Sequence, residues 1–258
     1  MSTLAYILLF TFFGSIAALI GGIVLLCYEK LALKISHLFA SFAAGILLGS
    51  AFFDLLPEAV HESEKLNINV HLWALIGIIL FFLIERFIHW FHHHEHQHEK
   101  QFSHERETKS TVSLIVIGDT VHNFIDGVVI AATFLVSIPL GVATTLAVAA
   151  HEIPQEIGDF GLLLHKGLSK QKIIVVNIVS AGVAFTGAII TYLLGDILEG
   201  YMPILLALTA GFFIYIATSD LIPEIHHEKR RGFAIIQSLL LLVGIATIWL
   251  SVSLLEHG

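Results

Sequence analysis

Eight long apolar stretches follow one another along the chain, separated by short polar segments. An α-helix needs roughly 20 such residues to cross the hydrocarbon core of a membrane. Because backbone groups in lipid must find their hydrogen bonds within the segment, the pattern predicts helices and not open strands. The predicted membrane spans are residues 3–27, 35–60, 71–90, 110–136, 139–164, 173–195, 202–225 and 232–255. The expected fold class is therefore an all-α polytopic membrane protein, with residues 1–258 forming one transmembrane domain.

The composition supports this expectation. Hydrophobic residues make up 56% of the chain and charged residues only 13%, whereas a soluble domain has about 25% charged residues. The mean hydropathy is +0.86. An ordinary soluble enzyme and a disordered chain are thereby excluded, and Cys27 as the only cysteine excludes a disulfide-stapled module. The net charge of −8 offers no basic surface, so we expect the lipid bilayer, and no nucleic acid, as a partner.

The basic residues predict the orientation in the membrane, since such residues concentrate in cytoplasmic loops. If the N-terminus lies outside, all of the 13 lysines and arginines except Lys65 fall on the inner side. Both termini are then predicted to face outwards, in a multi-pass protein of the cell membrane (a bacterial inner membrane or a plasma membrane). The loop 91–109 becomes cytoplasmic. Its alternating histidines and acids suit weak metal capture, although a solvated linker with incidental histidines has the same composition.

Two segments of the chain are similar to each other. Residues 44–62 read AGILLGSAFFDLLPEAVHE and residues 210–228 read AGFFIYIATSDLIPEIHHE, aligned without a gap at an offset of 166 positions (210 minus 44). The same offset relates the first span to the sixth and the third to the eighth. Since the two copies cross the membrane in opposite directions, the prediction is an inverted 3+2+3 repeat. Such repeats are typical of transporters that bind their substrate near the membrane midplane.

Polar residues interrupt the fourth and fifth spans, which are the two spans outside the repeat. The fourth span carries Asp119 and the motif HNFIDG at residues 122–127. The fifth span carries the motif HEIPQE at residues 151–156, and then Asp159. An ionisable group at the centre of a membrane helix costs at least ~2.5–3.5 kcal/mol, so these groups are expected to face one another, water or an ion.

Helical spacing brings these polar residues onto one face of each helix. His122 and Asp126 are four residues apart, as are His151 and Gln155. The short connection between the two spans makes them antiparallel neighbours, so that the two polar faces can meet. Imidazoles together with carboxylates suit borderline divalent metals such as Zn²⁺, Fe²⁺, Mn²⁺, Co²⁺ and Cd²⁺. We favour a metal pathway over a structural hydrogen-bond network, because polar contacts between membrane helices average only about 0.6 kcal/mol.

The two motifs together carry a resemblance to a known family. H-N-x-x-D-G followed by H-E-x-P-x-E-x-G-D-F resembles the ZIP (Zrt/Irt-like) metal transporters, and within them the subfamily whose fifth span reads H-E-x-P-H-E. The resemblance implies import of Zn²⁺ or similar ions into the cytoplasm, a site for two ions between spans four and five, and a homodimer. The metal is then cargo, and no cofactor and no enzymatic reaction are expected.

The resemblance also implies which residues bind the metal. The residues of the first position are His122, Asp126, His151 and Gln155. Those of the second position are Asn123, Glu152 and, from span six, Asn177, with Glu156 adjacent in the motif. Gln155 departs from the subfamily, which has histidine there, and its amide oxygen is a weaker and harder ligand than an imidazole.

Two other functions remain as alternatives. His151 and Glu152 begin like the H-E-x-x-H motif, in which two histidines hold zinc and the glutamate is the base, and an intramembrane zinc metalloprotease would use them. Gln155 stands where that motif has its second histidine, which speaks against a protease. A metal-gated channel is the second alternative, and the inverted repeat favours a carrier over it.

Overall fold

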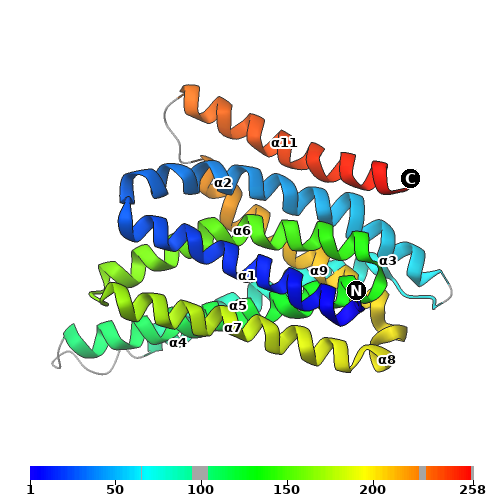
Figure 1. Cartoon of the computed structure of the whole chain (residues 1–258), viewed down its shortest axis with the longest axis horizontal. Helices are drawn as coiled ribbons and strands as arrows, with labels where there is room; N and C mark the ends of the chain where they lie inside the picture. Colours follow the sequence, from blue (N-terminus) through cyan, green and yellow to red (C-terminus); the bar gives the residue numbers. More distant parts are fainter. Residues whose placement is uncertain (65, 95–103, 227–230, 257–258) are drawn as a thin grey trace.

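The computed structural model describes residues 1–64, 66–94, 104–226 and 231–256, and every regular element in these ranges is a helix. The helices lie along one another in an elongated bundle (Figure 1). They are α1 (Thr3–Cys27), α2 (Glu29–Ser50), α3 (Leu56–Ser63), α4 (Val70–His94), α5 (His104–Val136), α6 (Ile138–His165), α7 (Lys170–Leu193), α8 (Gly195–Leu198), α9 (Met202–Tyr215), α10 (Ile222–His226) and α11 (Arg231–Glu256). The π-helical turns η1 (Ala51–Leu55) and η4 (Ile216–Leu221) and the 3₁₀ turn η3 (Glu199–Tyr201) connect some of them.

Most of the long helices have the length and hydropathy of membrane spans. Among the described residues, seven stretches qualify: Thr3–Cys27, Ser36–Ser63, Val70–Phe87, Ile115–Val136, Lys170–Leu193, Gly195–Leu221 and Gly232–Leu254. Helix α6, with 28 residues, has the length of an eighth span, and its polar motif lowers its hydropathy. The predicted fold class, an all-α polytopic membrane protein, is confirmed.

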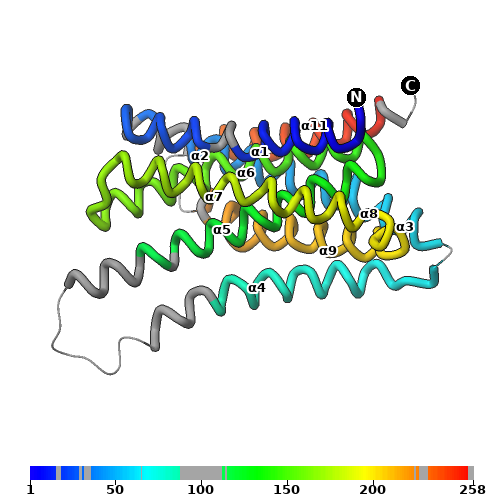
Figure 2. Tube along the Cα trace, turned by 60° about the horizontal axis from the view of Figure 1, so that its bottom comes forward, coloured from blue at the N-terminus to red at the C-terminus, as the bar shows by residue number. Residues whose placement is uncertain are grey.

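The connections between the long helices gather at the two ends of the bundle. Both views place the start of α1 and the end of α11 at one end, together with the α5–α6 connection (Figures 1 and 2). The α1–α2 and α6–α7 connections lie at the opposite end. Which end faces the cytoplasm stays a prediction. The histidine-rich loop falls largely on residues 95–103, which lie outside the described residues, while its flanks continue α4 and α5.

The helices pack in pairs that follow the repeat read from the sequence. Helix α1 packs on α6 and α5 on α7, whereas α2 packs on α11 and α4 on α9. The repeat relates α1 to α7, α2 to α9, α4 to α11 and α5 to α6. Exchanging the helices in this way turns the pair α1–α6 into α7–α5 and the pair α2–α11 into α9–α4. The site-bearing helices α5 and α6 therefore exchange with each other at the centre of this arrangement.

Two π-helical turns interrupt spans that the sequence predicted as continuous helices, residues 35–60 and 202–225. Leu55 and Leu221, the last residues of η1 and η4, are 166 positions apart (221 minus 55), which is the offset of the repeat. Each turn ends two residues before a proline, Pro57 or Pro223. Because proline has no N–H to donate, the regular α-helical hydrogen bonding is interrupted in the turn before it.

Glycines allow α5 and α7 to approach until their backbones touch. A Cβ on Gly127 would collide with the carbonyl oxygen of Ala184, and a Cβ on Gly187 with the carbonyl oxygen of Phe124. Small residues at helix interfaces are how membrane helices gain packing energy in the absence of a hydrophobic driving force. This contact holds the part of α5 that carries the polar motif, residues 122–127, against α7.

Replacing Gly187 with alanine tests this contact. We expect Gly187→Ala to destabilise the protein by about 1–3 kcal/mol, because the added methyl group must push two backbones apart. Gly182→Ala on the same helix is the matched control, since a Cβ there meets nothing within 4 Å. Thermal unfolding in detergent measures both variants. Equal melting temperatures for the two would contradict the backbone contact.

Candidate metal centre

Helices α5 and α6 are antiparallel neighbours because only Ser137 separates them. The Ser137 side chain accepts a hydrogen bond from the Leu140 backbone N–H at 3.3 Å and so caps the start of α6. A serine at this position satisfies one of the free N–H groups of the first helical turn. The chain thus reverses in one step, and the polar stripes of the two helices come face to face.

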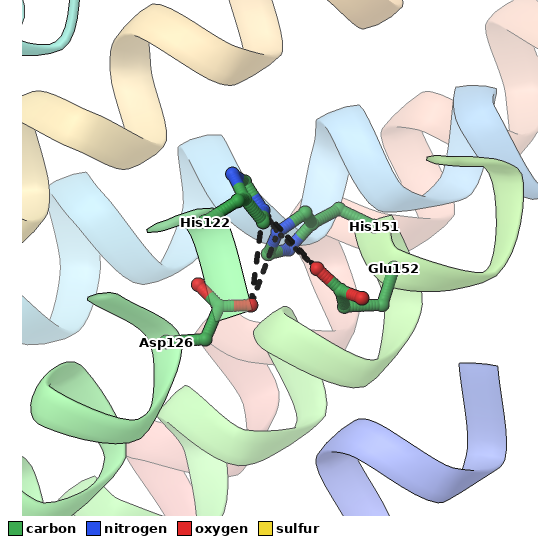
Figure 3. A group of neighbouring side chains, drawn as sticks. All are labelled: His122, Asp126, His151 and Glu152. Carbon is green, nitrogen blue, oxygen red and sulfur yellow. Dashed lines mark hydrogen bonds and ion pairs between the residues drawn. The ribbon is translucent and has the colours of Figure 1, made fainter. Parts of the chain in front are cut away.

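Four side chains of these stripes converge on a common point (Figure 3). His122 and Asp126 come from α5, and His151 and Glu152 come from α6; we call these four residues the central cluster. One potential ligand atom from each lies within 4.8 Å of all the others. The Nε2 atom of His122 is 3.1 Å from Nε2 of His151 and 3.1 Å from Oε1 of Glu152. The Oδ2 atom of Asp126 is 3.8 Å from Nε2 of His122 and 3.7 Å from Nε2 of His151.

These separations match the edges of a tetrahedral metal site. Bonds of about 2.0–2.2 Å from zinc to nitrogen and oxygen place the ligand atoms about 3.3–3.6 Å apart. His151 Nε2 is 3.8 Å from Glu152 Oε1. The five separations in the cluster therefore run from 3.1 to 3.8 Å, on both sides of the tetrahedral value. Two imidazoles and two carboxylates are a ligand set for borderline divalent metals.

Three residues of the central cluster are buried, and three of its carboxylate oxygens accept no hydrogen bond. Asp126 is 5% exposed, and His151 and Glu152 are each 1% exposed. Oδ2 of Asp126 and both carboxylate oxygens of Glu152 accept no hydrogen bond. A buried carboxylate without compensation costs several kcal/mol even after the protein relaxes. A cation held between these oxygens would remove that cost.

The hydrogen bonding of His151 leaves one of its ring nitrogens available for a metal. Its Nδ1 atom lies 3.0 Å from the carbonyl oxygen of Ala147. A carbonyl oxygen can only accept, so Nδ1 carries the hydrogen and donates it. In the neutral ring, Nε2 then has a lone pair, and it is Nε2 that faces the central cluster. A fixed tautomer of this kind is a common property of histidines that ligate metals.

Aromatic rings from α4 and α9 pack against the two imidazoles of the central cluster. The ring of Phe81 meets the His122 ring edge to face, with centroids 5.9 Å apart. The ring of Phe213 lies 6.3 Å from the ring of His151. Both phenylalanines are buried. They restrict the orientation of the imidazoles and exclude water, which strengthens the electrostatic interactions within the site.

The other predicted ligands lie around the central cluster. Asn123 and Asn177 are each 1% exposed, and Asn177 donates from its amide to the Ile173 carbonyl at 2.8 Å. Gln155 is half-buried one turn beyond His151, and its part in the first position stays a prediction. Glu152, assigned by resemblance to the second position, lies in the central cluster beside the two histidines and Asp126.

One acidic residue next to the site was absent from the predicted ligands. Asp119 is 6% exposed, and its Oδ1 accepts a hydrogen bond of 2.8 Å from the amide of Asn123. The same amide nitrogen is 3.1 Å from the Asp119 carbonyl oxygen and 3.4 Å from Oγ of Ser180 on α7. Asp119 precedes Asn123 by four residues, so the helical spacing contained the signal for this contact. Nothing in the sequence pattern distinguished Phe81 and Phe213 from the many other apolar residues.

Several curated zinc transporters are similar to this chain. Mouse zinc transporter ZIP10 is 38% identical over 152 residues, which is 55% of this chain and 18% of that protein. Human zinc transporter ZIP6 is 35% identical over 151 residues, covering 56% of this chain and 20% of that protein. Rat zinc transporter ZIP4 is 29% identical over 320 residues, covering 95% of this chain and 48% of that protein.

The chain thus spans less than half the length of each of these relatives. The model of one family, described as ZIP zinc transporter, matches residues 2–251, which is nearly the whole chain. Together with the two polar motifs on neighbouring helices, this match shows the family. The chain belongs to the ZIP zinc transporter family.

Proposed function

We propose that the protein carries divalent transition-metal ions, Zn²⁺ above all, across the cell membrane into the cytoplasm. The observation that carries this proposal is the central cluster, in which two imidazoles and two buried carboxylates meet inside a bundle of apolar helices. Such a set is expensive in a membrane unless it serves an ion. The proposal includes Fe²⁺, Mn²⁺, Co²⁺ and Cd²⁺ as further substrates, since the same ligands suit them.

The residues of the cluster have distinct roles in this proposal. His151, held by the Ala147 carbonyl, presents a fixed lone pair, and His122 supplies the second nitrogen. Asp126 and Glu152 neutralise the charge of a divalent ion, so the loaded site is electrically balanced. Since every ligand must be free of protons to bind, uptake of the metal releases protons, which is a general property of such sites.

A second ion position is part of the proposal. Asn123, Glu152 and Asn177 are its proposed ligands, with Gln155 and Glu156 beside them. Asn123 and Asn177 are buried, and both use their amide nitrogens within the protein, Asn123 toward Asp119 and Asn177 toward Ile173. Their amide oxygens are thus the atoms that would face an ion. We further propose a homodimer as the form in the membrane.

The two alternative functions are less well supported. ZIP family proteins are transporters and not enzymes, so the family match contradicts the intramembrane metalloprotease. The pairwise exchange of helices supports a carrier over a metal-gated channel, because inverted repeats are built for alternating access. A carrier saturates with its substrate, and this distinguishes it from a channel in the uptake measurement below.

Uptake of radioactive zinc into vesicles containing the protein tests the transport function. We expect His122→Ala and Glu152→Ala each to lower uptake by more than about tenfold, because loss of even an indirect partner of a metal ligand costs 10–100-fold. The matched control is Glu199→Ala, which removes an exposed glutamate in the η3 turn. Wild-type uptake by both cluster variants would contradict the proposed site, and uptake that never saturates would favour a channel.

Labelling of single cysteines tests the predicted orientation in the membrane. In a Cys27→Ser background, we expect Asp196→Cys to react with a membrane-impermeant maleimide in intact cells. We expect His165→Cys to react only after the membrane is permeabilised, because the basic residues place that end of α6 in the cytoplasm. Asp196 and His165 are both exposed, so access does not limit the reaction. The reverse labelling pattern would contradict the orientation.

Replacing Gln155 with histidine tests whether this residue belongs to the site. We expect Gln155→His to tighten Zn²⁺ binding, because imidazole is a softer ligand than an amide oxygen and suits zinc better. Isothermal titration of the purified protein measures the change, and a tenfold effect corresponds to about 1.4 kcal/mol. Unchanged or weaker binding would show that Gln155 is no ligand.

A further inference from the structure

A groove of about 460 Å³ lies between α1 and α7, with α6 beneath it; we call it the lateral groove. Three of its lining side chains are buried and form its floor: Leu19 of α1, Phe160 of α6 and Ala181 of α7. Its rims are open, since Ile20 of α1 is 60% exposed and Ile178 of α7 is 53% exposed. Nearly all of the lining is apolar, so water is a poor occupant of the groove.

The lateral groove is about as long as one leaflet of a membrane is thick. On α7 its lining runs from Ile174 to Phe185, which are 11 positions apart (185 minus 174). That distance is about 16 Å along a helix, and half of the hydrocarbon core is about 15 Å. Gly182 in this stretch leaves the space open, because a Cβ there would meet nothing within 4 Å. The groove therefore has the length of one lipid acyl chain.

A lysine connects α7 with α1 just beyond one end of the lateral groove. Lys170 precedes the lining residue Ile174 by four positions and so lies on the same face of α7. Its Nζ atom donates a hydrogen bond to the carbonyl oxygen of Leu26, which follows the lining residue Ile23 by three positions on α1. An ammonium group has three N–H groups, and this contact uses one of them. Lys170 can therefore bind an anion while it keeps its contact with α1.

The charges around this end of the lateral groove are mainly positive. Lys166 at the end of α6 and Lys172 in the first turn of α7 are near neighbours of Lys170 in the sequence, and that first turn has no acid. The α1–α2 connection adds one residue of each sign, Glu29 and Lys30. The predicted orientation places this end at the cytoplasmic surface, where anionic lipids concentrate and attract lysines. An apolar groove with a cationic end fits an amphiphile with an apolar chain and an anionic head.

We propose that the lateral groove binds one anionic phospholipid, with an acyl chain along Ile174–Phe185 and the headgroup phosphate at Lys170. This inference does not depend on the transport proposal, because no residue of the central cluster lines the groove. The two are nevertheless connected through α6: Phe160 follows Glu152 by eight positions (160 minus 152) on the same helix. A bound acyl chain therefore packs against a helix that carries two residues of the central cluster.

Binding of radioactive phosphatidylglycerol to the purified full-length protein in detergent tests this inference. Phosphatidylcholine with the same acyl chains is the zwitterionic comparison. We expect the wild type to prefer phosphatidylglycerol by about tenfold or more, because each lysine near an anionic headgroup contributes about fivefold. Gly182→Phe fills the groove and is expected to lose both lipids. The double variant Lys170→Gln, Lys172→Gln is expected to bind the two lipids equally, since glutamine removes the charge and keeps a hydrogen-bond donor.

Two matched controls accompany these variants. Val179→Phe adds the same ring to α7 at a position that is 65% exposed and does not line the groove. Arg86→Gln removes an exposed positive charge from α4, which is not among the helices that line the groove. Both controls are expected to bind the two lipids as the wild type does.

The outcomes separate a lipid from the other possible occupant, a second copy of the chain. Equal binding of the two lipids by the wild type would overturn the inference, and so would unchanged phosphatidylglycerol binding by Gly182→Phe. A changed oligomeric state of Gly182→Phe in light scattering, with lipid binding intact, would assign the groove to a second copy and overturn it as well. If Gly182→Phe fails to fold, Gly182→Leu is measured in its place, and wild-type lipid binding by that variant then contradicts the inference.

Discussion

The main constraint on this fold is to keep two imidazoles and two carboxylates together in the interior of a helical bundle. Oδ2 of Asp126 and both oxygens of Glu152 receive no hydrogen bond, and only the imidazoles and a bound ion can compensate their charge. The rest of the bundle holds the helices that carry them. Ser137 reverses the chain in one residue, Gly127 and Gly187 let α7 touch α5, and rings of α4 and α9 pack against the imidazoles.

The repeat explains where this cluster lies. The exchange that relates the helix pairs maps α5 onto α6, so a site between them lies on the axis of the repeat. His122 and His151 each open the motif of their helix, and their Nε2 atoms meet at 3.1 Å. The acids break this symmetry: the residue four positions after the histidine is Asp126 on α5 and Gln155 on α6. Glu152 supplies the second carboxylate that a divalent ion needs for neutrality.

Much of the fold was predictable because lipid restricts the chain to helices of known length. The resemblance also placed three of the four cluster residues, His122, Asp126 and His151, in one metal position, and helical spacing supports the pair His122 and Asp126. Whether the Glu152 side chain enters the cluster depends on the rotation of α6 about its own axis relative to α5. The spacing of residues along one helix does not determine this rotation. The π-turns before Pro57 and Pro223 were also not predictable, and neither were the aromatic rings beside the imidazoles. Both depend on how segments distant in the sequence pack together.

The charges along α5 and α6 give the pathway a direction. Between Asp126 and Glu152, the chain runs through the α5–α6 connection without a single carboxylate, and Ile130, Ala147 and Val148 on this side are buried. On the other side of the central cluster, Asp119, Glu156 and Asp159 follow within about two helical turns. An ion bound at the proposed site would therefore be attracted toward the end of the bundle with the α6–α7 connection and would meet an apolar barrier at the other end. To load from that other end, the helices around Ile130 and Val148 must separate, which is the movement that alternating access requires of them.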